Sequence, residues 1–190
     1  RKDGQVASGG DAAMGDGESV AERLAQWGFS WAGLLDNRRG EWWLIAQLLL
    51  IAAHLLPPEP PLGAAWPLML RLIGWGTFAI GLLLAAQAFF NLGPSLTPLP
   101  EPMPGAPLVT RGAYGRCRHP LYQAVLLCSL GVSLAMGSLL HLGLLLSLAV
   151  VLGGKARREE RHLEQLHGDY AAYRVSTPAI IPCLPWLDWH

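Results

Sequence analysis

The sequence alternates between long apolar segments and shorter polar ones. Four apolar segments stand out, at about residues 42–56, 68–92, 121–136 and 138–154. A helix rises about 1.5 Å per residue, so the second segment can cross the roughly 30 Å hydrocarbon core of a bilayer, whereas the first reaches only about 22 Å. Trp42 and Trp43 can extend the first segment by lying at the membrane interface. The pattern therefore predicts about four transmembrane helices.

A very short polar segment separates the last two apolar segments. It consists of Met136-Gly137-Ser138, and glycine followed by serine favours a turn. We therefore expect a helical hairpin over residues 121–154, although one bent span is an alternative. The predicted fold class is an all-α integral membrane protein.

The segments before the first span are polar or amphipathic. Residues 1–17 are rich in glycine, alanine and aspartate and show no periodicity, which is typical of disorder. Ser19 and Glu22 then form a possible capping box at the start of an amphipathic helix within residues 18–40. This helix would lie at the membrane interface or pack on the cytoplasmic surface of the protein itself. Residues 41–190 would form the membrane domain.

Two further polar segments adjoin the predicted spans. Residues 91–107 contain six prolines, which favour an extended, stiff chain and suggest a lid or wall. Residues 155–167 predict an amphipathic cytoplasmic helix. On this helix Glu159 would share a face with Leu163, whereas Glu160 and Glu164 would point to the solvated side.

Composition supports a membrane protein and argues against some partners. Of 190 residues, 52% are hydrophobic and 15% charged, whereas soluble domains carry about 25% charged residues. The 14 basic and 14 acidic residues balance, so we expect no nucleic-acid partner. The three cysteines have no paired spacing and are expected to be free thiols, and no histidine, cysteine and carboxylate cluster predicts a metal site. The sequence carries no signal for a particular oligomeric state.

Two polar motifs flank the predicted hairpin. The first, Leu108–Tyr122, reads LVTRGAYGRCRHPLY. Polar and ionisable groups beside a membrane are costly, so they usually serve a function. The second motif follows the hairpin and consists of Glu159-Glu160-x-x-Leu163, Gly168-x-Tyr170-x-x-Tyr173 and a closing Ile181-Pro182.

LVT-x-G-x-Y with RHP-x-Y, followed by the second motif, resembles the isoprenylcysteine carboxyl methyltransferase family. This family belongs to a wider group that includes phospholipid methyltransferases, and the resemblance covers about residues 88–182. It implies an integral-membrane methyltransferase that uses S-adenosylmethionine. The acceptor would be a lipophilic small molecule or lipidated substrate that arrives from the lipid membrane and bears a carboxylate, amine or thiol.

The resemblance also implies site residues within 106–122 and 155–173. The implied cofactor-binding residues are Ala106, Pro107, Leu108, Val109, Tyr114, His119, Pro120, Leu121, Tyr122, Glu159 and Glu160. Members that form methyl esters hold the substrate carboxylate with an arginine four residues before the cofactor glutamate. Here that position is Lys155, with Arg157 and Arg158 nearby, so these three are candidates for binding or positioning a substrate anion. Lysine keeps the charge but not the bidentate geometry of arginine.

The chemistry of these residues agrees with a cofactor site. Aromatic faces such as those of Tyr114 and Tyr122 can receive a cationic sulfur. Pro120 suits the first turn of a helix and would fix His119 at its mouth. Other residues have simpler interpretations: the arginines at 111, 116 and 118 as positive-inside residues, the tyrosines at 170 and 173 as packing residues, and the carboxylate at 160 as a solvated charge.

Charge placement predicts the orientation. Lys and Arg cluster before the first span, after the second and after the hairpin, and the other two loops contain none. The positive-inside rule then places both termini and both motifs in the cytoplasm.

Two alternatives remain from the sequence. Sterol-type membrane reductases have a similar C-terminal pattern and use NADPH, whose extra phosphate would need the arginines of the first motif. A non-catalytic membrane protein with a degenerate motif would bind neither cofactor.

Overall fold

The computed structural model describes residue 37 and residues 40–93, 105 and 107–190. They form helices α3 (Glu41–Ala53), α4 (Leu68–Leu92), α5 (Pro120–Met136), α6 (Leu139–Leu166) and α7 (Tyr170–Ser176), and the short 3₁₀ helices η1 (Gly63–Ala65) and η3 (Gly112–Gly115). No strand occurs among these residues, so the all-α prediction is confirmed for them. The predicted disorder at 1–17, the amphipathic helix of 18–40 and most of the proline-rich segment lie outside the described residues.

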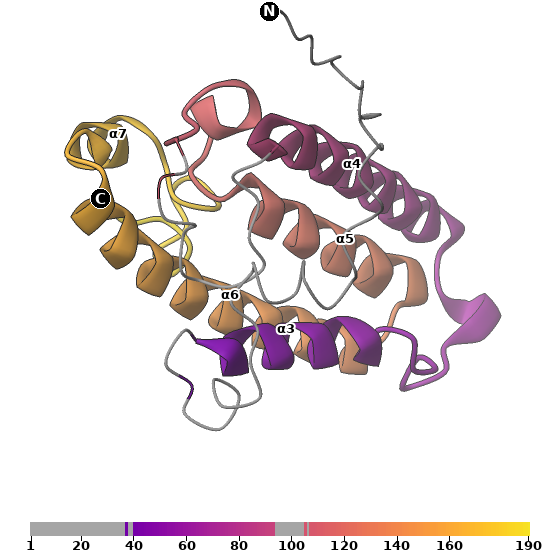
Figure 1. The fold of residues 1–190 in the computed structure, drawn as a ribbon. Coiled ribbons are helices and arrows are strands. Elements are labelled where there is room, and N and C mark those ends of the chain that lie inside the picture. The colour runs from indigo at the N-terminus through magenta and orange to yellow at the C-terminus, as the bar shows by residue number, and fades with distance from the viewer. Residues whose placement is uncertain (1–36, 38–39, 94–104, 106) are drawn as a thin grey trace, which may run out of the picture.

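The long helices lie side by side in the order α4, α5, α6, α3 (Figure 1). Helices that lie side by side are therefore not always neighbours in the sequence. Helix α3 packs on α6, which begins more than eighty residues after α3 ends. The short α7 lies at the end of α6 that is far from the hairpin turn (Figure 1). This arrangement brings the start of α5 and the second half of α6 toward one end of the bundle.

Glycines allow the close approach of α4 and α5. A Cβ built at Gly131 would lie 2.5 Å from the backbone nitrogen of Phe78, and one at Gly81 would lie 2.6 Å from the sulfur of Cys128. Small residues at such positions let two membrane helices pack backbone to backbone. The pairing of α4 with α5 therefore depends on the absence of side chains at these sites.

Gly137 and Ser138 form the hairpin turn between α5 and α6, and each has a structural role. Gly137 ends α5 with φ of 60°, in the left-handed region that favours glycine. Ser138 caps α6 and also bonds the backbone of Glu59, with Oγ 2.9 Å from the Glu59 nitrogen. Near this turn His54 of the α3 end bonds Ser129 of α5 at 2.6 Å. These polar contacts join three helices at the end opposite the two motifs.

The helix α6 continues from the hairpin through Lys155 to Leu166, where the sequence suggested a span followed by a separate helix. Gly153 and Gly154 do not break it, and Trp186 and Trp43 pack into the space that their missing side chains leave. Its 28 residues would measure about 42 Å, more than the roughly 30 Å of a hydrocarbon core. One rigid helix therefore carries both a membrane-length apolar half and the charged second motif.

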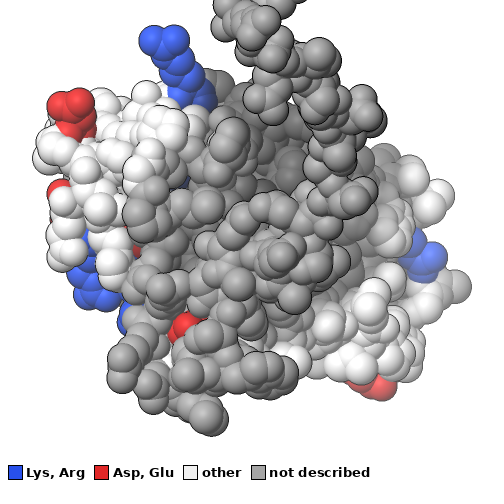
Figure 2. All heavy atoms as spheres, in the orientation of Figure 1, with Lys and Arg blue, Asp and Glu red and all other residues white. Residues whose placement is uncertain are grey.

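Two of the described helices, α4 and α6, are long and apolar enough to cross a membrane. The apolar α3 and α5 are shorter, with 13 and 17 residues, and the four-span arrangement stays a prediction. Large apolar side chains cover the surface of α4, for example Phe90, which is 79% exposed. Most of the described surface visible on one face is uncharged, and several of its charged side chains lie toward the end that carries α7 (Figure 2).

Replacing Gly74 by alanine should destabilise the protein, whereas the same change at Gly76 should not. A Cβ at Gly74 would lie 2.7 Å from the carbonyl oxygen of Gly131, and overpacking of this kind costs about 1–3 kcal/mol. Gly76 lies on the same helix with nothing within 4 Å of an added Cβ, and alanine there gains up to about 1 kcal/mol of helix propensity. Thermal melts of both variants in one detergent compare them, and an unchanged melting temperature for Gly74→Ala would contradict the close packing.

Candidate functional site

The first motif is held against the C-terminal tail by backbone hydrogen bonds. The Arg118 amide donates to the carbonyl of Pro178 at 2.9 Å, and the His119 amide donates to that of Ala179 at 3.0 Å. His119 is the residue before α5, and Pro120 occupies the first turn, where its missing N–H leaves no bond unmade. The loop and the tail thus fix the entry to α5 from both sides.

Arg118 lies inside the protein and not at its surface. Its side chain donates from Nε to Glu160 at 2.7 Å and from its terminal nitrogens to the carbonyls of Arg174, Thr177 and Trp189. Arg118 is 3% exposed, so its guanidinium is not a solvent-exposed charge, while the orientation that the positive-inside rule gives stays a prediction. Arg118 ties the first motif to α6, α7 and the tail.

Glu160 is also buried, although the helical pattern placed it on the solvated side. Its carboxylate contacts Arg118, lies 2.8 Å from His119 Nε2 and accepts a hydrogen bond from Trp189 Nε1 at 2.7 Å. The expectation was wrong because the tail folds over this side of α6, which the pattern within the helix cannot indicate. Glu160 does not line the cavity described next.

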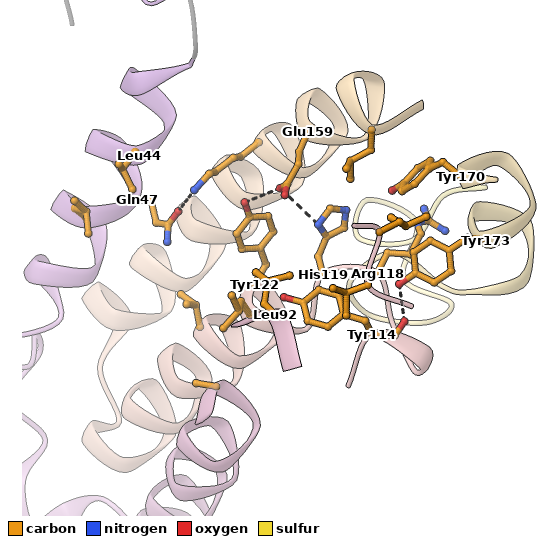
Figure 3. A pocket seen from close by; sticks show the side chains of 18 residues that line it. Leu44, Gln47, Leu92, Tyr114, Arg118, His119, Tyr122, Glu159, Tyr170 and Tyr173 are labelled. Carbon is orange, nitrogen blue, oxygen red and sulfur yellow. Dashed lines mark hydrogen bonds and ion pairs between the residues drawn. The ribbon is translucent and has the colours of Figure 1, made fainter. Parts of the chain in front are cut away.

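A cavity of about 360 Å³ lies between the helices beside this cluster (Figure 3). Volumes of about 300–1,000 Å³ are typical of small-molecule sites. The lining residues are Leu44, Gln47, Leu48, Ala85, Leu92, Leu108, Val109, Tyr114, Arg118, His119, Leu121, Tyr122, Val125, Lys155, Glu159, Leu163, Tyr170 and Tyr173. Both motifs contribute to it, and α3 and α4 add mainly apolar side chains.

His119, Tyr122 and Glu159 form the polar wall of the cavity (Figure 3). The His119 and Tyr122 rings stack at 5.4 Å with an interplanar angle of 3°. Tyr122 donates its hydroxyl to Glu159 Oε2 at 2.9 Å, and His119 Nδ1 lies 3.8 Å from the same oxygen. The Glu159 side chain is 23% exposed, so this carboxylate is oriented by its neighbours and still reachable by a ligand.

Three tyrosines close the cavity near η3 and α7. Tyr173 donates to the backbone carbonyl of Tyr114 at 2.5 Å, and Tyr170 is almost fully buried beside it. Burial raises the pKa of Tyr114, Tyr170 and Tyr173, and nearby negative charge from Glu159 or Glu160 adds to this. They therefore stay protonated near neutral pH. The packing interpretation of the two α7 tyrosines missed that both also line the cavity.

Lys155 lines the cavity where its polar and apolar parts meet. Its ammonium donates to Gln47 of α3 at 2.9 Å and lies 5.2 Å from the centre of the Tyr122 ring. Arg157, by contrast, is stacked between Trp186 and Trp189 at 4.2 and 4.1 Å. Of the three cations predicted to hold a substrate anion, the structure brings only Lys155 to the cavity.

The structure places the other predicted residues in two groups. Eight of the predicted residues line the cavity: Leu108, Val109, Tyr114, His119, Leu121, Tyr122, Lys155 and Glu159. Five predicted residues do not: Pro107, Pro120, Arg157, Arg158 and Glu160. Ala106 lies outside the described residues.

Several lining residues were missed by reasoning from the sequence. Most come from α3 and α4, namely Leu44, Gln47, Leu48, Ala85 and Leu92, and Val125 comes from α5. Apolar side chains in apolar segments carry no signal of a cavity. Gln47 did carry one, since it is a polar residue within an apolar run. In the described part of the chain, no three His, Cys, Asp or Glu residues are arranged to hold a metal ion.

Residues 70–170 match the sequence model of the phospholipid methyltransferase family. The chain belongs to this family. The match spans most of α4 and all of α5 and α6, and it includes the cavity-lining residues His119 and Glu159. Membership in a methyltransferase family, together with two helices of membrane-spanning length and apolarity, indicates an integral membrane protein.

A segment of this family member is also similar to the cobalt-zinc-cadmium resistance protein CzcN of Cupriavidus metallidurans. The two are 40% identical over 78 residues, which make up 40% of this chain and 36% of that protein. The similarity thus spans little more than a third of the length of that relative. No solved structure matches the chain.

Replacing Glu160 by glutamine should strongly destabilise this family member. The change leaves the Arg118 guanidinium buried without its counter-charge, and breaking a buried pair in this way costs about 3–5 kcal/mol. Glu164→Gln is the matched control on the same helix, because Glu164 pairs with Arg174 at the surface, where such a pair contributes about 0–1 kcal/mol. Unfolding titrations measure both, and equal losses would contradict a structural role for the buried pair.

Proposed function

We propose that this protein is an integral-membrane methyltransferase that transfers a methyl group from S-adenosylmethionine to a lipophilic acceptor. The observation that carries the proposal is the shared cavity. Motif residues separated by forty positions, His119 and Glu159, meet there with 3.8 Å between Nδ1 and Oε2. The same cavity continues to apolar side chains of α3 and α4.

The polar wall suits the donor molecule. The Glu159 carboxylate can pair with an ammonium group, and the face of Tyr114 can lie against a cationic sulfur or an adenine ring. The backbone at Leu108 and Val109 borders the same space and can offer hydrogen bonds. These groups match the charged, aromatic and polar parts of S-adenosylmethionine.

The residues of the cavity would act mainly by orientation. S-adenosylmethionine supplies an electrophilic methyl carbon, to which the acceptor's lone pair bonds as the carbon–sulfur electron pair returns to the sulfur. Tyr122 and His119 fix the direction of the Glu159 carboxylate. Holding two reactants in line can account for a large part of the rate enhancement. The surrounding apolar side chains exclude water from the nucleophile.

The acceptor would enter from the bilayer. Leu48 of α3 lines the cavity and is also 53% exposed, so the cavity reaches the apolar outer surface of the bundle. A lipid chain could lie along Leu48, Ala85 and Val125 with its head group toward Lys155. An acceptor that is lipophilic and bears a polar reactive group fits this gradient from apolar to polar lining.

The reductase alternative gains no support from the site. It would use the first-motif arginines to bind an extra phosphate, but Arg118 is engaged by Glu160 and Arg116 donates to Gln87. The family match is to a methyltransferase family. Methyl transfer is therefore the function that the observations support best.

Substitution of Glu159 or His119 by alanine should abolish binding of S-adenosylmethionine. Each change removes a polar group from the wall that would hold the donor, so we expect at least a tenfold loss of affinity, about 1.4 kcal/mol or more. Binding of the labelled cofactor to purified protein measures this, with Glu164→Ala as a surface control. Unchanged affinity in both variants would remove the assignment of the site.

The reaction itself can be tested on membranes. Extracts incubated with S-adenosylmethionine that carries a heavy methyl group should contain a labelled lipophilic product, detected by mass spectrometry. Membranes that contain Glu159→Ala protein are the control. Equal labelling with both proteins would contradict methyl transfer by this site.

Both motifs should face the cytoplasm, because Lys and Arg gather on that side of the predicted spans. The exposed Cys183 lies in the tail near the site. A membrane-impermeant maleimide should therefore label Cys183 in inverted vesicles and not in right-side-out ones. Pro61→Cys in a Cys183→Ser protein should show the opposite pattern, since Pro61 lies in the loop at the other end of α4. Labelling of both cysteines from one side would contradict the orientation.

A further inference from the structure

Gln47 occupies an unusual place for an amide side chain. It lies in the apolar helix α3, and its Oε1 accepts a hydrogen bond from Lys155 Nζ of α6 at 2.9 Å (Figure 3). Both residues line the cavity, and Lys155 is 2% exposed. A polar residue in a membrane helix is costly and usually faces a functional interior. Here it faces a buried cation.

The contact fixes the position of the Lys155 ammonium. A lysine side chain is long and flexible, and it can move its charge toward water when nothing holds it. Gln47 holds it from one side, and the face of Tyr122 lies 5.2 Å away on another. Lys155 is thereby kept beside the apolar part of the cavity, near Leu44 and Leu48 on α3.

The other charges that line the cavity determine which ligand charge is favourable beside the Lys155 ammonium. The charge of Arg118 is matched by Glu160 at 2.7 Å. Among the described lining residues, and leaving His119 aside, the remaining charges are those of Lys155 and Glu159, which have opposite signs. S-adenosylmethionine carries a sulfonium, an ammonium and a carboxylate, so its binding adds a net positive charge. A second positive charge on the acceptor would then be unfavourable in a site of low polarity, and a negative one favourable.

We infer that Gln47 is a specificity-determining residue: by holding Lys155 in place, it makes the cavity select an acceptor with an anionic head group over one with a cationic head group. This inference rests on the proposed function and narrows its substrate class. It assigns Gln47 a positioning role, because Gln47 acts through Lys155. A carboxylate or thiolate on an apolar chain has the required charge, whereas a protonated amine does not.

Two probes of equal chain length and opposite charge test the inference. Octanesulfonate and octyltrimethylammonium are not expected to accept a methyl group, so their binding can be measured with S-adenosylmethionine present. Calorimetry on protein in nanodiscs, with empty nanodiscs subtracted, gives both affinities. We expect the wild-type protein to bind the anion at least about tenfold more tightly than the cation. Equal affinities, no binding of either probe, or preference for the cation would overturn the inference.

Substitutions at Gln47 separate its role from general stability. Gln47→Glu keeps the size of the side chain but places a carboxylate against Lys155, so the preference for the anion should fall at least about tenfold. Gln47→Leu should lower it by less, and Trp42→Glu, on the same helix but outside the cavity lining, should leave it unchanged. An unaltered preference in Gln47→Glu would overturn the inference.

Measurement of cofactor affinity distinguishes failure of the inference about Gln47 from failure of the proposed function. The uncharged Gln47→Leu variant should bind labelled S-adenosylmethionine as the wild-type protein does, because it adds no charge to the cavity and Gln47 does not belong to the polar wall. Intact cofactor binding without discrimination between the probes would overturn only the role of Gln47. Absence of cofactor binding in the wild-type protein would overturn the proposed function.

Discussion

The ion pair between Arg118 and Glu160 joins parts of the chain that are far apart in the sequence. The guanidinium comes from the loop before α5, the carboxylate from α6, and the remaining hydrogen bonds reach α7 and the tail. Charges removed from water are stable only with well-placed partners. This one pair of residues and its hydrogen bonds join four segments of the chain. The position of His119 and the wall of the cavity therefore depend on the pair.

The continuous helix α6 converts this local cluster into a membrane site. It packs beside α5 and α3, and its second half carries Glu159 and Glu160 beyond the apolar region. A break at Gly153 would have allowed the charged half to swing away. Trp186 and Trp43 pack against the helix at these glycines. Polar chemistry and apolar access are therefore connected by one rigid element.

Much of the fold could be predicted from residue patterns, and part of the site could not. Hydrophobic runs and the Gly137 turn indicate helices close to those observed, and the resemblance of the motifs to a methyltransferase family implies His119, Tyr122 and Glu159 as site residues. The burial of Glu160 could not be predicted, because helical periodicity describes neighbours within one helix and not a tail that folds over it. Gln47 was visible as a polar interruption, but its partner Lys155 lies 108 positions away.

The separation of α3 from its partner has a consequence for biogenesis. Helices α4 and α5 follow one another along the chain and can pair early, whereas α3 gains its main neighbour only when α6 has been made. Contacts between distant parts of a chain form late, because a longer loop must close first. During synthesis the wall of the cavity that α3 provides would therefore be the last to assemble, and until then Gln47 would lack its partner Lys155.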